Sequence, residues 1–192
     1  MAGVLRFTGW WFCIVYASIP LFWLVIHPFT SYWRARRRSP YRILLPFWAA
    51  IWALLALITY RWRGILLYQN AWSWLPGLGL ILPGFWLYFA STRGFTGKYI
   101  SGMAEILPGD AAPQLIVSGI RRRIRHPMYA GHFCEALGWS IGTGSVVCFA
   151  LAAFAIFMGS IMIRAEDKEL ESRFGEQYRT YRRDVPAFLP KL

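Results

Sequence analysis

Long apolar runs alternate with shorter polar segments along the chain. The first three runs cover residues 10–26, 43–60 and about 71–90. Each approaches the ~20 residues that a helix needs to cross the hydrocarbon core of a bilayer, and membrane helices tolerate the prolines within them. The first run lacks a convincing basic start and a small-residue cleavage site, so we expect an anchor rather than a removed signal peptide. The pattern predicts three membrane-spanning helices within residues 1–90.

A longer apolar stretch follows Pro127 and continues to Ile163, which is too long for one crossing. The GTGS sequence at residues 142–145 predicts a tight turn within it. The arm before the turn, residues 127–141, would be about 22 Å long, short of the ~30 Å hydrocarbon core. We therefore expect an all-α integral membrane fold with about five transmembrane helices. The last two would form a tight helical hairpin that packs inside the protein or does not fully cross.

The amino-acid composition agrees with a membrane location. Hydrophobic residues make up 57% of the 192 residues and charged residues only 16%, against about 25% charged residues in soluble domains. This excludes a disordered tail, a collagen-like fibre and most small soluble enzymes, and it predicts a single membrane domain over residues 1–192. The three cysteines, Cys13, Cys134 and Cys148, all fall in apolar runs. They form neither a disulfide framework nor a metal-binding CxxC pair.

The basic residues predict how the chain is oriented. The net charge is +12, and the 21 Lys and Arg lie mostly between apolar runs, which favours anionic headgroups over nucleic acid as partners. Eighteen of them occur in alternate segments and three in the others. The positive-inside rule then places the N-terminus outside, with the loop at residues 91–125 and the C-terminal segment in the cytoplasm. In a bacterium the membrane would be the inner one.

The first cluster of possible chemistry covers residues 119–131, with the sequence GIRRRIRHPMYAG. Pro127 suits the first turn of a helix, where its missing N–H has no consequence. Arg125 and His126 would then lie at the positive end of the helix dipole, which suits a carboxylate or phosphate group. A second interpretation is that the arginines at 121–125 are a positive-inside flank that contacts lipid phosphates.

Glu135 is the one acid within an apolar run. Ionisable residues inside the membrane are costly, which makes Glu135 a functional candidate. The alternative is a structural hydrogen bond or ion pair, with His132 as the partner. The three histidines of the chain have no recognisable metal-ligand spacing, so we expect no metal site.

The second cluster covers residues 164–181. Four apolar or aromatic residues recur at helical spacing among charged ones and predict an amphipathic helix along the membrane surface: Leu170, Phe174, Tyr178 and Tyr181. Glu166 and Glu169 stand just after the last apolar run. They could bind a cationic ligand, pair with the arginines at 121–125, or lie on a solvated face.

At these two clusters the sequence resembles the isoprenylcysteine carboxyl methyltransferase family, which is related to phospholipid methyltransferases. The matching pieces are LIVSG at residues 115–119, RHPMYAG at 125–131, the ED…L…FG…Y…Y pattern at 166–181, and VP…LP at 185–190. They follow the family's order over about the last 80 residues. The first three spans resemble the family only in hydropathy.

The resemblance implies a membrane methyltransferase that uses S-adenosylmethionine, with a catalytic region at residues 91–192. The cytoplasmic loop, the start of the RHPMY helix and the acids after the hairpin would form the cofactor pocket. A lipidic or prenylated substrate would enter sideways from the bilayer. The family's cofactor residues correspond here to Leu115, Ile116, His126, Pro127, Met128, Tyr129 and Glu166.

This chain departs from the family at its substrate-binding arginine. The family usually has that arginine four residues before the first Glu of the pattern, where this chain has Met162. Arg164 is half a turn away and is our first choice for the cation that orients the acceptor; Arg125 is the second. Two smaller departures are Pro113, in place of a frequent His, and Arg121, in place of a frequent Tyr.

The acceptor chemistry leaves alternatives open. A carboxylate acceptor, as in an isoprenylcysteine, is already ionised at pH 7 and needs only an orienting cation. An aminophospholipid would arrive protonated and would need a base, for which Glu135 or His132 are candidates. A non-catalytic protein whose basic loops bind anionic lipid is the third hypothesis.

Overall fold

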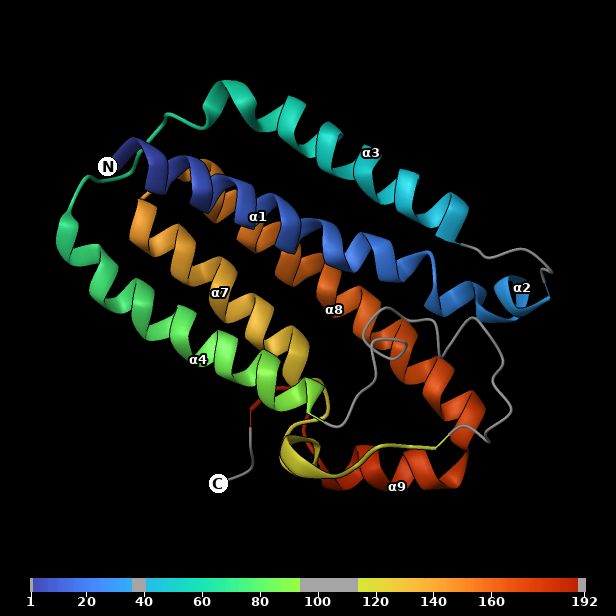
Figure 1. Ribbon diagram of the computed structural model, residues 1–192. Coiled ribbons are helices and arrows are strands. Elements are labelled where there is room, and N and C mark those ends of the chain that lie inside the picture. Colours follow the sequence, from blue (N-terminus) through green and yellow to red (C-terminus); the bar gives the residue numbers. More distant parts are fainter. Residues whose placement is uncertain (1, 36–40, 94–113, 190–192) are drawn as a thin grey trace.

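The computed structural model describes residues 2–35, 41–93 and 114–189, and its regular elements in these ranges are helices (Figure 1), apart from one isolated bridge between Leu66 and Ser145. The long helices are α1 (Ala2–Leu24), α3 (Tyr41–Thr59), α4 (Trp74–Thr92), α7 (Pro127–Thr143) and α8 (Val146–Phe174). The shorter elements are η1 (His27–Phe29), α2 (Thr30–Arg34), η2 (Tyr60–Trp62), η3 (Ala71–Ser73), η4 (Gly119–Arg122) and α9 (Glu176–Asp184). The predicted all-α fold is confirmed for the described residues.

Within the described residues, four helical segments are long and apolar enough to cross a membrane: Gly3–Arg34, Tyr41–Trp62, Ala71–Thr92 and Val146–Phe174. This count is one fewer than the five predicted. The difference is α7, whose 17 residues give a length of only about 25 Å. It also carries the polar residues His132 and Glu135. It is therefore shorter than the four spans around it, and its two ionisable side chains lie in the middle of the helix.

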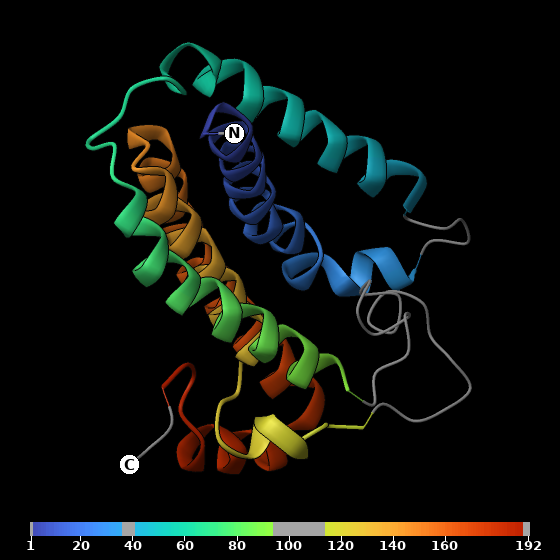
Figure 2. The same ribbon diagram turned by 60° about the vertical axis from the view of Figure 1, so that its left-hand side comes forward.

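The helices form one elongated bundle in which α7 lies between α4 and α8 (Figures 1 and 2). The C-terminal ends of α1, α4 and α8 and the N-terminal end of α7 gather at the same end of this bundle, with η4 and α9 beside them. The N-terminus and the turn between α7 and α8 lie at the opposite end. The two sequence clusters are therefore brought to one end of the molecule.

Glycines let α4 and α7 approach each other closely. A Cβ atom on Gly84 would lie 2.9 Å from Gly131 O, and one on Gly138 would lie 2.6 Å from Gly77 O. Gly77 and Gly84 are seven residues apart on α4, and Gly131 and Gly138 are seven residues apart on α7. The two glycines of each helix therefore lie on the face that meets the other helix. Small residues of this kind are how membrane helices gain contact area, because lipid does not drive helices together as water does.

We expect Gly131→Ala to lower the free energy of unfolding by about 1–3 kcal/mol, because a Cβ there would lie 2.7 Å from Gly84 O, a backbone atom that has little room to move. Gly79→Ala, also in a helix but facing open space, is the matched control. The control should be neutral or slightly stabilising, since Ala favours helix over Gly. Thermal unfolding in detergent measures both. Equal melting temperatures would contradict this account of the α4–α7 contact.

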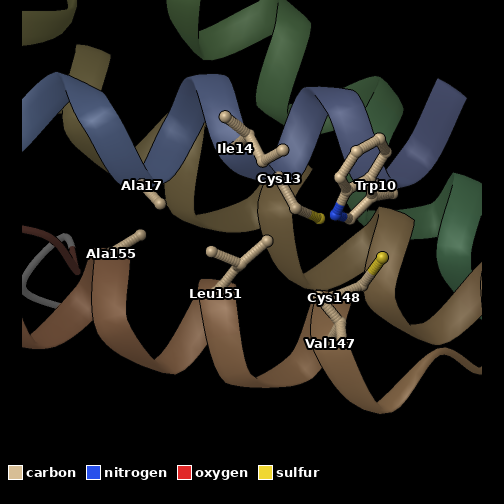
Figure 3. Packing of buried hydrophobic residues seen from close by; sticks show 8 residues of the cluster. All are labelled: Trp10, Cys13, Ile14, Ala17, Val147, Cys148, Leu151 and Ala155. Carbon is tan, nitrogen blue, oxygen red and sulfur yellow. The ribbon is translucent and has the colours of Figure 1, made fainter. Parts of the chain in front are cut away.

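The main apolar core joins α1 to α8 (Figure 3). Both helices contribute buried side chains that point toward each other. Cys13 and Cys148 are fully buried among them as free thiols. The cysteines therefore act as small packed hydrophobic residues. The cluster consists of Trp10, Cys13, Ile14 and Ala17 from α1 and Val147, Cys148, Leu151 and Ala155 from α8.

Indole donors attach α3 to α1. Trp48 and Trp52 both donate to the Ser18 hydroxyl, at 2.8 and 2.7 Å, and Trp10 donates to the Thr59 hydroxyl at 2.9 Å. The opposite face of α3 is apolar and exposed. This arrangement suits a helix that faces lipid on one side and the bundle on the other.

The turn between α7 and α8 lies where the GTGS sequence predicted one. Gly144 ends α7 in the left-handed conformation, at φ 66°, which glycine adopts without strain. The connection between η2 and η3 closes over this turn: Leu67 N donates to Gly144 O at 2.8 Å and Val146 N donates to Ile65 O at 3.1 Å. The two helices thus lie side by side with a very short connection.

Gly175 interrupts the helix that the spacing of Leu170, Phe174, Tyr178 and Tyr181 predicted. It has φ 56° and ψ −128°, so α8 ends at Phe174 and α9 starts in a new direction at Glu176. The prediction of one continuous stripe is wrong, because the glycine conformation separates its first two members from its last two. Tyr178 is turned back toward α8 as a result.

Candidate active site

Asp167 on α8 is the centre of a buried group of polar side chains at the start of α7. Its Oδ1 atom accepts hydrogen bonds from Arg125 Nη1, at 2.7 Å, and from the Tyr178 hydroxyl, and it lies 2.9 Å from His126 Nε2. The Asp167 and Arg125 side chains are only 7% and 9% exposed. Arg182 adds a longer ion pair of 3.7 Å to Oδ2. One carboxylate therefore joins α7, α8 and α9.

The backbone around Arg125 and His126 is held by the C-terminal segment. Arg125 N donates to Pro186 O at 2.9 Å and His126 N donates to Ala187 O at 3.0 Å. Arg125 Nε donates to Val185 O, also at 2.9 Å. Since Pro127 begins α7 without an N–H, these contacts satisfy the donors just before the helix. The VP pattern at residues 185–186 thus serves to position the RHP sequence.

The arginines before this segment divide into two groups. Arg121 is partly buried, and its Nη1 donates to Ser91 O at 2.6 Å while its carbonyl accepts a hydrogen bond from Tyr181 at 2.7 Å. It ties η4 to the end of α4 and to α9. Arg122 and Arg123 are exposed. Only these two fit the interpretation of an arginine flank that contacts lipid phosphates.

His126 lies between two carboxylates. Its Nδ1 atom is 3.4 Å from Glu166 Oε2 and its Nε2 atom is 2.9 Å from Asp167 Oδ1. Burial lowers the pKa of His126, but the charge of Glu166 and the hydrogen bond to Asp167 outweigh it and raise the pKa from 6.5 to about 9. The imidazole is therefore charged at neutral pH. Burial and its bond to Asp167 also raise the pKa of Tyr178, which keeps the phenol protonated as a donor.

This shift predicts a pH dependence of stability. Because the folded-state pKa of His126 lies above its unfolded value, the stabilisation is fully present below about pH 6.5 and is lost as pH rises through about 9. We expect the wild type to lose about 3 kcal/mol more than His126→Gln between pH 6 and pH 10. Thermal unfolding across this range measures the difference. Parallel pH profiles for the two proteins would contradict a charged His126.

Glu166 Oε2 is buried and accepts no hydrogen bond from the residues that the structure describes. The ion pair with His126 orients the carboxylate without satisfying this atom. A buried acceptor left in this state is a place for a ligand donor, such as an ammonium or a hydroxyl group. The site thus fits a cofactor that carries an ammonium group and hydroxyl groups. Because the Glu166 side chain is only 17% exposed, Glu166 does not lie on a freely solvated face.

Three of the other predicted cofactor residues, Pro127, Met128 and Tyr129, form the first turn of α7. Pro127 and Tyr129 are buried, and Met128 is half-buried. Tyr129 packs with Met162 and Ile163 of α8 in one apolar cluster. Leu115 and Ile116 lie in the irregular segment before η4 and are half-buried.

Arg164 is not brought to this cluster. Its side chain is exposed, and since it precedes Glu166 by two residues it projects from nearly the opposite side of α8. Met162, at the family's arginine position, is fully buried in the apolar cluster with Tyr129. Arg125 is present in the cluster, but its Nε and Nη1 are already engaged by Val185, Asp167 and Tyr178.

Glu135 lies deeper in the bundle, at 2% exposure, where α7 meets α4. Its Oε2 is 3.8 Å from His132 Nδ1, and its Oε1 accepts no hydrogen bond from the described residues. The His132 ring lies between the rings of Tyr16 and Tyr88, with centroids 5.5 and 5.4 Å away. Glu135 is nine residues after His126, about 13 Å along the helix axis. It therefore forms a separate polar position.

Sequence reasoning missed the central role of Asp167 and the part of Tyr178. Both stand within the matched pattern at residues 166–181, so the signal was present. Among the described residues, the arginines at 121–125 do not pair with Glu166 or Glu169, the two acids for which this pairing was considered; Arg125 pairs with Asp167 instead. Glu166 instead pairs with His126, and Glu169 pairs with Arg173 and Arg34.

The bundle contains four helices that are able to cross a membrane, and a buried group of acids and a histidine lies at one end of it. These features define an integral membrane protein with a polar site at one end. The chain belongs to the phospholipid methyltransferase family, whose model matches residues 72–177, more than half of its length. The match includes Asp167 and Glu166 together with all of α7. The family resemblance drawn from the sequence is confirmed.

Individual relatives carry several names. Protein-S-isoprenylcysteine O-methyltransferase of Schizosaccharomyces pombe is 32% identical over 124 residues, which cover 56% of this chain and 52% of the relative. Cobalt-zinc-cadmium resistance protein CzcN of Cupriavidus metallidurans is 31% identical over 140 residues, covering 71% and 61%. Methanethiol S-methyltransferase 2 of Bradyrhizobium diazoefficiens is 26% identical over 148 residues, covering 72% and 56%. The chain spans about half the length of the curated relatives it matches.

Proposed function

We propose that the protein is an S-adenosylmethionine-dependent membrane methyltransferase that esterifies the carboxylate of an isoprenylcysteine-like or other lipidic acceptor. The observation that carries the proposal is Glu166, a partly buried carboxylate whose buried Oε2 atom accepts no hydrogen bond from the described residues and is oriented by His126. It lies in the part of the chain that the family model matches. The S. pombe relative, named as an isoprenylcysteine O-methyltransferase, supports a carboxylate acceptor.

The cofactor would be held at the start of α7. Glu166 would accept hydrogen bonds from its ammonium or ribose hydroxyl groups, and the apolar side chains before and within the first turn of α7 would cover its base. Bound there, the cofactor supplies a methyl group on a sulfonium. The residues proposed to hold it are Leu115, Ile116, His126, Pro127, Met128, Tyr129 and Glu166.

The protein's contribution to the reaction would be mainly positioning. A carboxylate acceptor is ionised at pH 7, so no base has to remove a proton from it. Holding the acceptor in line with the bond to be broken then supplies much of the rate. Arg125 fixes the site rather than the acceptor, because two of its nitrogens are engaged. Arg164, exposed on α8, would have to act on an acceptor that approaches from the lipid side.

The distribution of charge supports a cytoplasmic site. The 18 basic residues that occur in alternate segments include those of η4, α9 and the end of α8, all at the site end of the bundle. By the positive-inside rule this end would face the cytoplasm and the N-terminus would lie outside. Labelling of a cysteine introduced at exposed Arg179 in sealed inside-out and right-side-out vesicles tests this orientation.

Glu135 supports a second candidate function. A buried carboxylate beside His132 could accept the proton of an amine or thiol acceptor, which a carboxylate acceptor does not need to lose. Methylation of an aminophospholipid, or of a thiol as in the name of the B. diazoefficiens relative, would use it. The distance from the start of α7 makes this the weaker assignment.

An acceptor panel separates these functions. Purified protein is incubated with methyl-labelled S-adenosylmethionine and, in turn, a farnesylated cysteine, phosphatidylethanolamine and a small thiol. We expect label in an ester that mild alkali releases, from the farnesylated cysteine alone. Alkali-stable label in phosphatidylethanolamine or in the thiol would replace carboxyl methylation with the second function. Absence of transfer to all three, together with no binding of S-adenosylmethionine, would leave the non-catalytic lipid-binding hypothesis.

A further inference from the structure

A pocket of about 500 Å³ lies on α8 beside the segment that follows α1. The last turns of α8 line one side of it, and η1 and α2, which pack against α8, line the other. Its polar lining comes mainly from Thr30, Ser31, Arg34, Lys168, Glu169 and Arg173. None of these residues belongs to the proposed cofactor set. His27, which also lines the pocket, lies close enough to Glu166 and His126 for electrostatic interaction, so the pocket adjoins that site.

The charge of this pocket is unbalanced. Among the described residues that line it, Arg34, Lys168 and Arg173 are basic and Glu169 is the only acid, which leaves two positive charges in excess. Glu169 Oε2 is 2.8 Å from Arg173 Nη2 and Glu169 Oε1 is 3.8 Å from Arg34 Nη2. Lys168 is exposed and makes no ion pair with the described residues. The pocket can therefore take an anion without losing its internal ion pairs.

Arg173 offers a donor that nothing in the described protein uses. The Arg173 side chain is only 15% exposed. Its Nε atom is buried and has no hydrogen-bond partner among the described residues. The guanidinium lies 5.1 Å from the centroid of the Phe174 ring, which helps to hold its orientation. A buried unsatisfied donor is unfavourable unless a ligand completes it. The hydroxyls of Thr30 and Ser31 add further donors around the same space.

We infer that this pocket binds the phosphate group of an anionic membrane lipid. A phosphate is an oxyanion that matches an arginine donor, a lysine charge and hydroxyl donors together. The pocket opens near the end of a membrane-spanning helix, where Phe157 and Ile161 are exposed apolar residues earlier on α8. Basic pockets between membrane helices are typical sites for lipid headgroups. The inference does not depend on the proposed methyl transfer.

The test uses the full chain in detergent and measures the affinity for a fluorescent phosphatidic acid in mixed micelles. We expect the double variant Lys168→Gln, Arg173→Gln to bind about ten- to thirtyfold more weakly than the wild type. The matched control is Arg179→Gln, Arg183→Gln, which removes the same charge from exposed positions on α9. Lys168→Gln alone, at an exposed position, should lower the affinity about threefold or more without affecting the fold.

Three outcomes would overturn the inference. Equal affinities of the double variant and the α9 control would show that the pocket does not bind the headgroup. Displacement of the lipid by an equal concentration of inorganic phosphate would assign the pocket to a soluble phosphate ester instead. Loss of S-adenosylmethionine binding in Lys168→Gln would make the pocket part of the cofactor site. If Lys168→Gln binds the lipid more weakly but still binds S-adenosylmethionine, the result supports a lipid-phosphate pocket. This holds whatever the acceptor panel shows.

Discussion

Asp167→Asn is expected to lower the free energy of unfolding by about 3–5 kcal/mol, the range for removing one partner of a buried ion pair. The substitution keeps the shape of the side chain but removes the charge that Arg125 and His126 share. Those two cations would remain buried next to each other with only Glu166 to balance them. In thermal unfolding of the detergent-purified protein, the melting temperature should fall by about 10 °C or more.

The control for this variant is Asp184→Asn. Asp184 has a side chain that is 60% exposed and pairs only with the neighbouring Arg183 among the described contacts. Exposed pairs of this kind contribute about 0–1 kcal/mol, so its melting temperature should stay within about 2 °C of the wild type. If the melting temperature of Asp167→Asn also stayed within about 2 °C of the wild type, the stabilising role of the Asp167 carboxylate would be contradicted.

His126→Ala and Glu166→Ala are expected to reduce methyl transfer by about a hundredfold or more at normal expression. Glu166 would lose its direct contact with the cofactor. His126→Ala would leave Glu166 and Asp167 as two buried acids without the cation between them. His126 and Glu166 are the two partners of one ion pair, and each substitution removes that pair. The double variant should therefore be little less active than either single variant. The measurement is turnover of the farnesylated cysteine with labelled donor.

Glu176→Ala provides the comparison for turnover, because its side chain is 73% exposed at the start of α9. It should retain the activity of the wild type. Retained turnover in both His126→Ala and Glu166→Ala would remove the site assignment, even if the protein proved to be a methyltransferase.

The helices and the end of the bundle that carries the site could be predicted from the sequence, because hydropathy and charge act over whole segments. The GTGS turn and the first turn at Pro127 followed from local backbone chemistry in the same way. The facing of single residues on α8 could not be predicted. Arg164, Glu166 and Asp167 are neighbours in sequence, but a 100° rotation per residue points them in different directions, and only packing decides which one is buried.

The break at Gly175 and the role of the VP pattern required tertiary information. A glycine can lie within a helix at a modest cost or end it, so the spacing of the apolar residues did not reveal the break. The positive φ of Gly175 accompanies the hydrogen bond from Tyr178 to Asp167, a contact that only the tertiary structure shows. Likewise the hydrogen bonds from Arg125 and His126 to residues 186 and 187 join positions about 60 residues apart. No periodicity within either segment reports such a contact.

Calorimetric titration of S-adenosylmethionine and S-adenosylhomocysteine into detergent-purified protein tests the central claim most directly. The account predicts micromolar binding of both by the wild type and by Glu176→Ala, and no measurable binding by Glu166→Ala. Failure of a folded wild-type sample to bind either compound would contradict the claim, as would equal binding by Glu166→Ala.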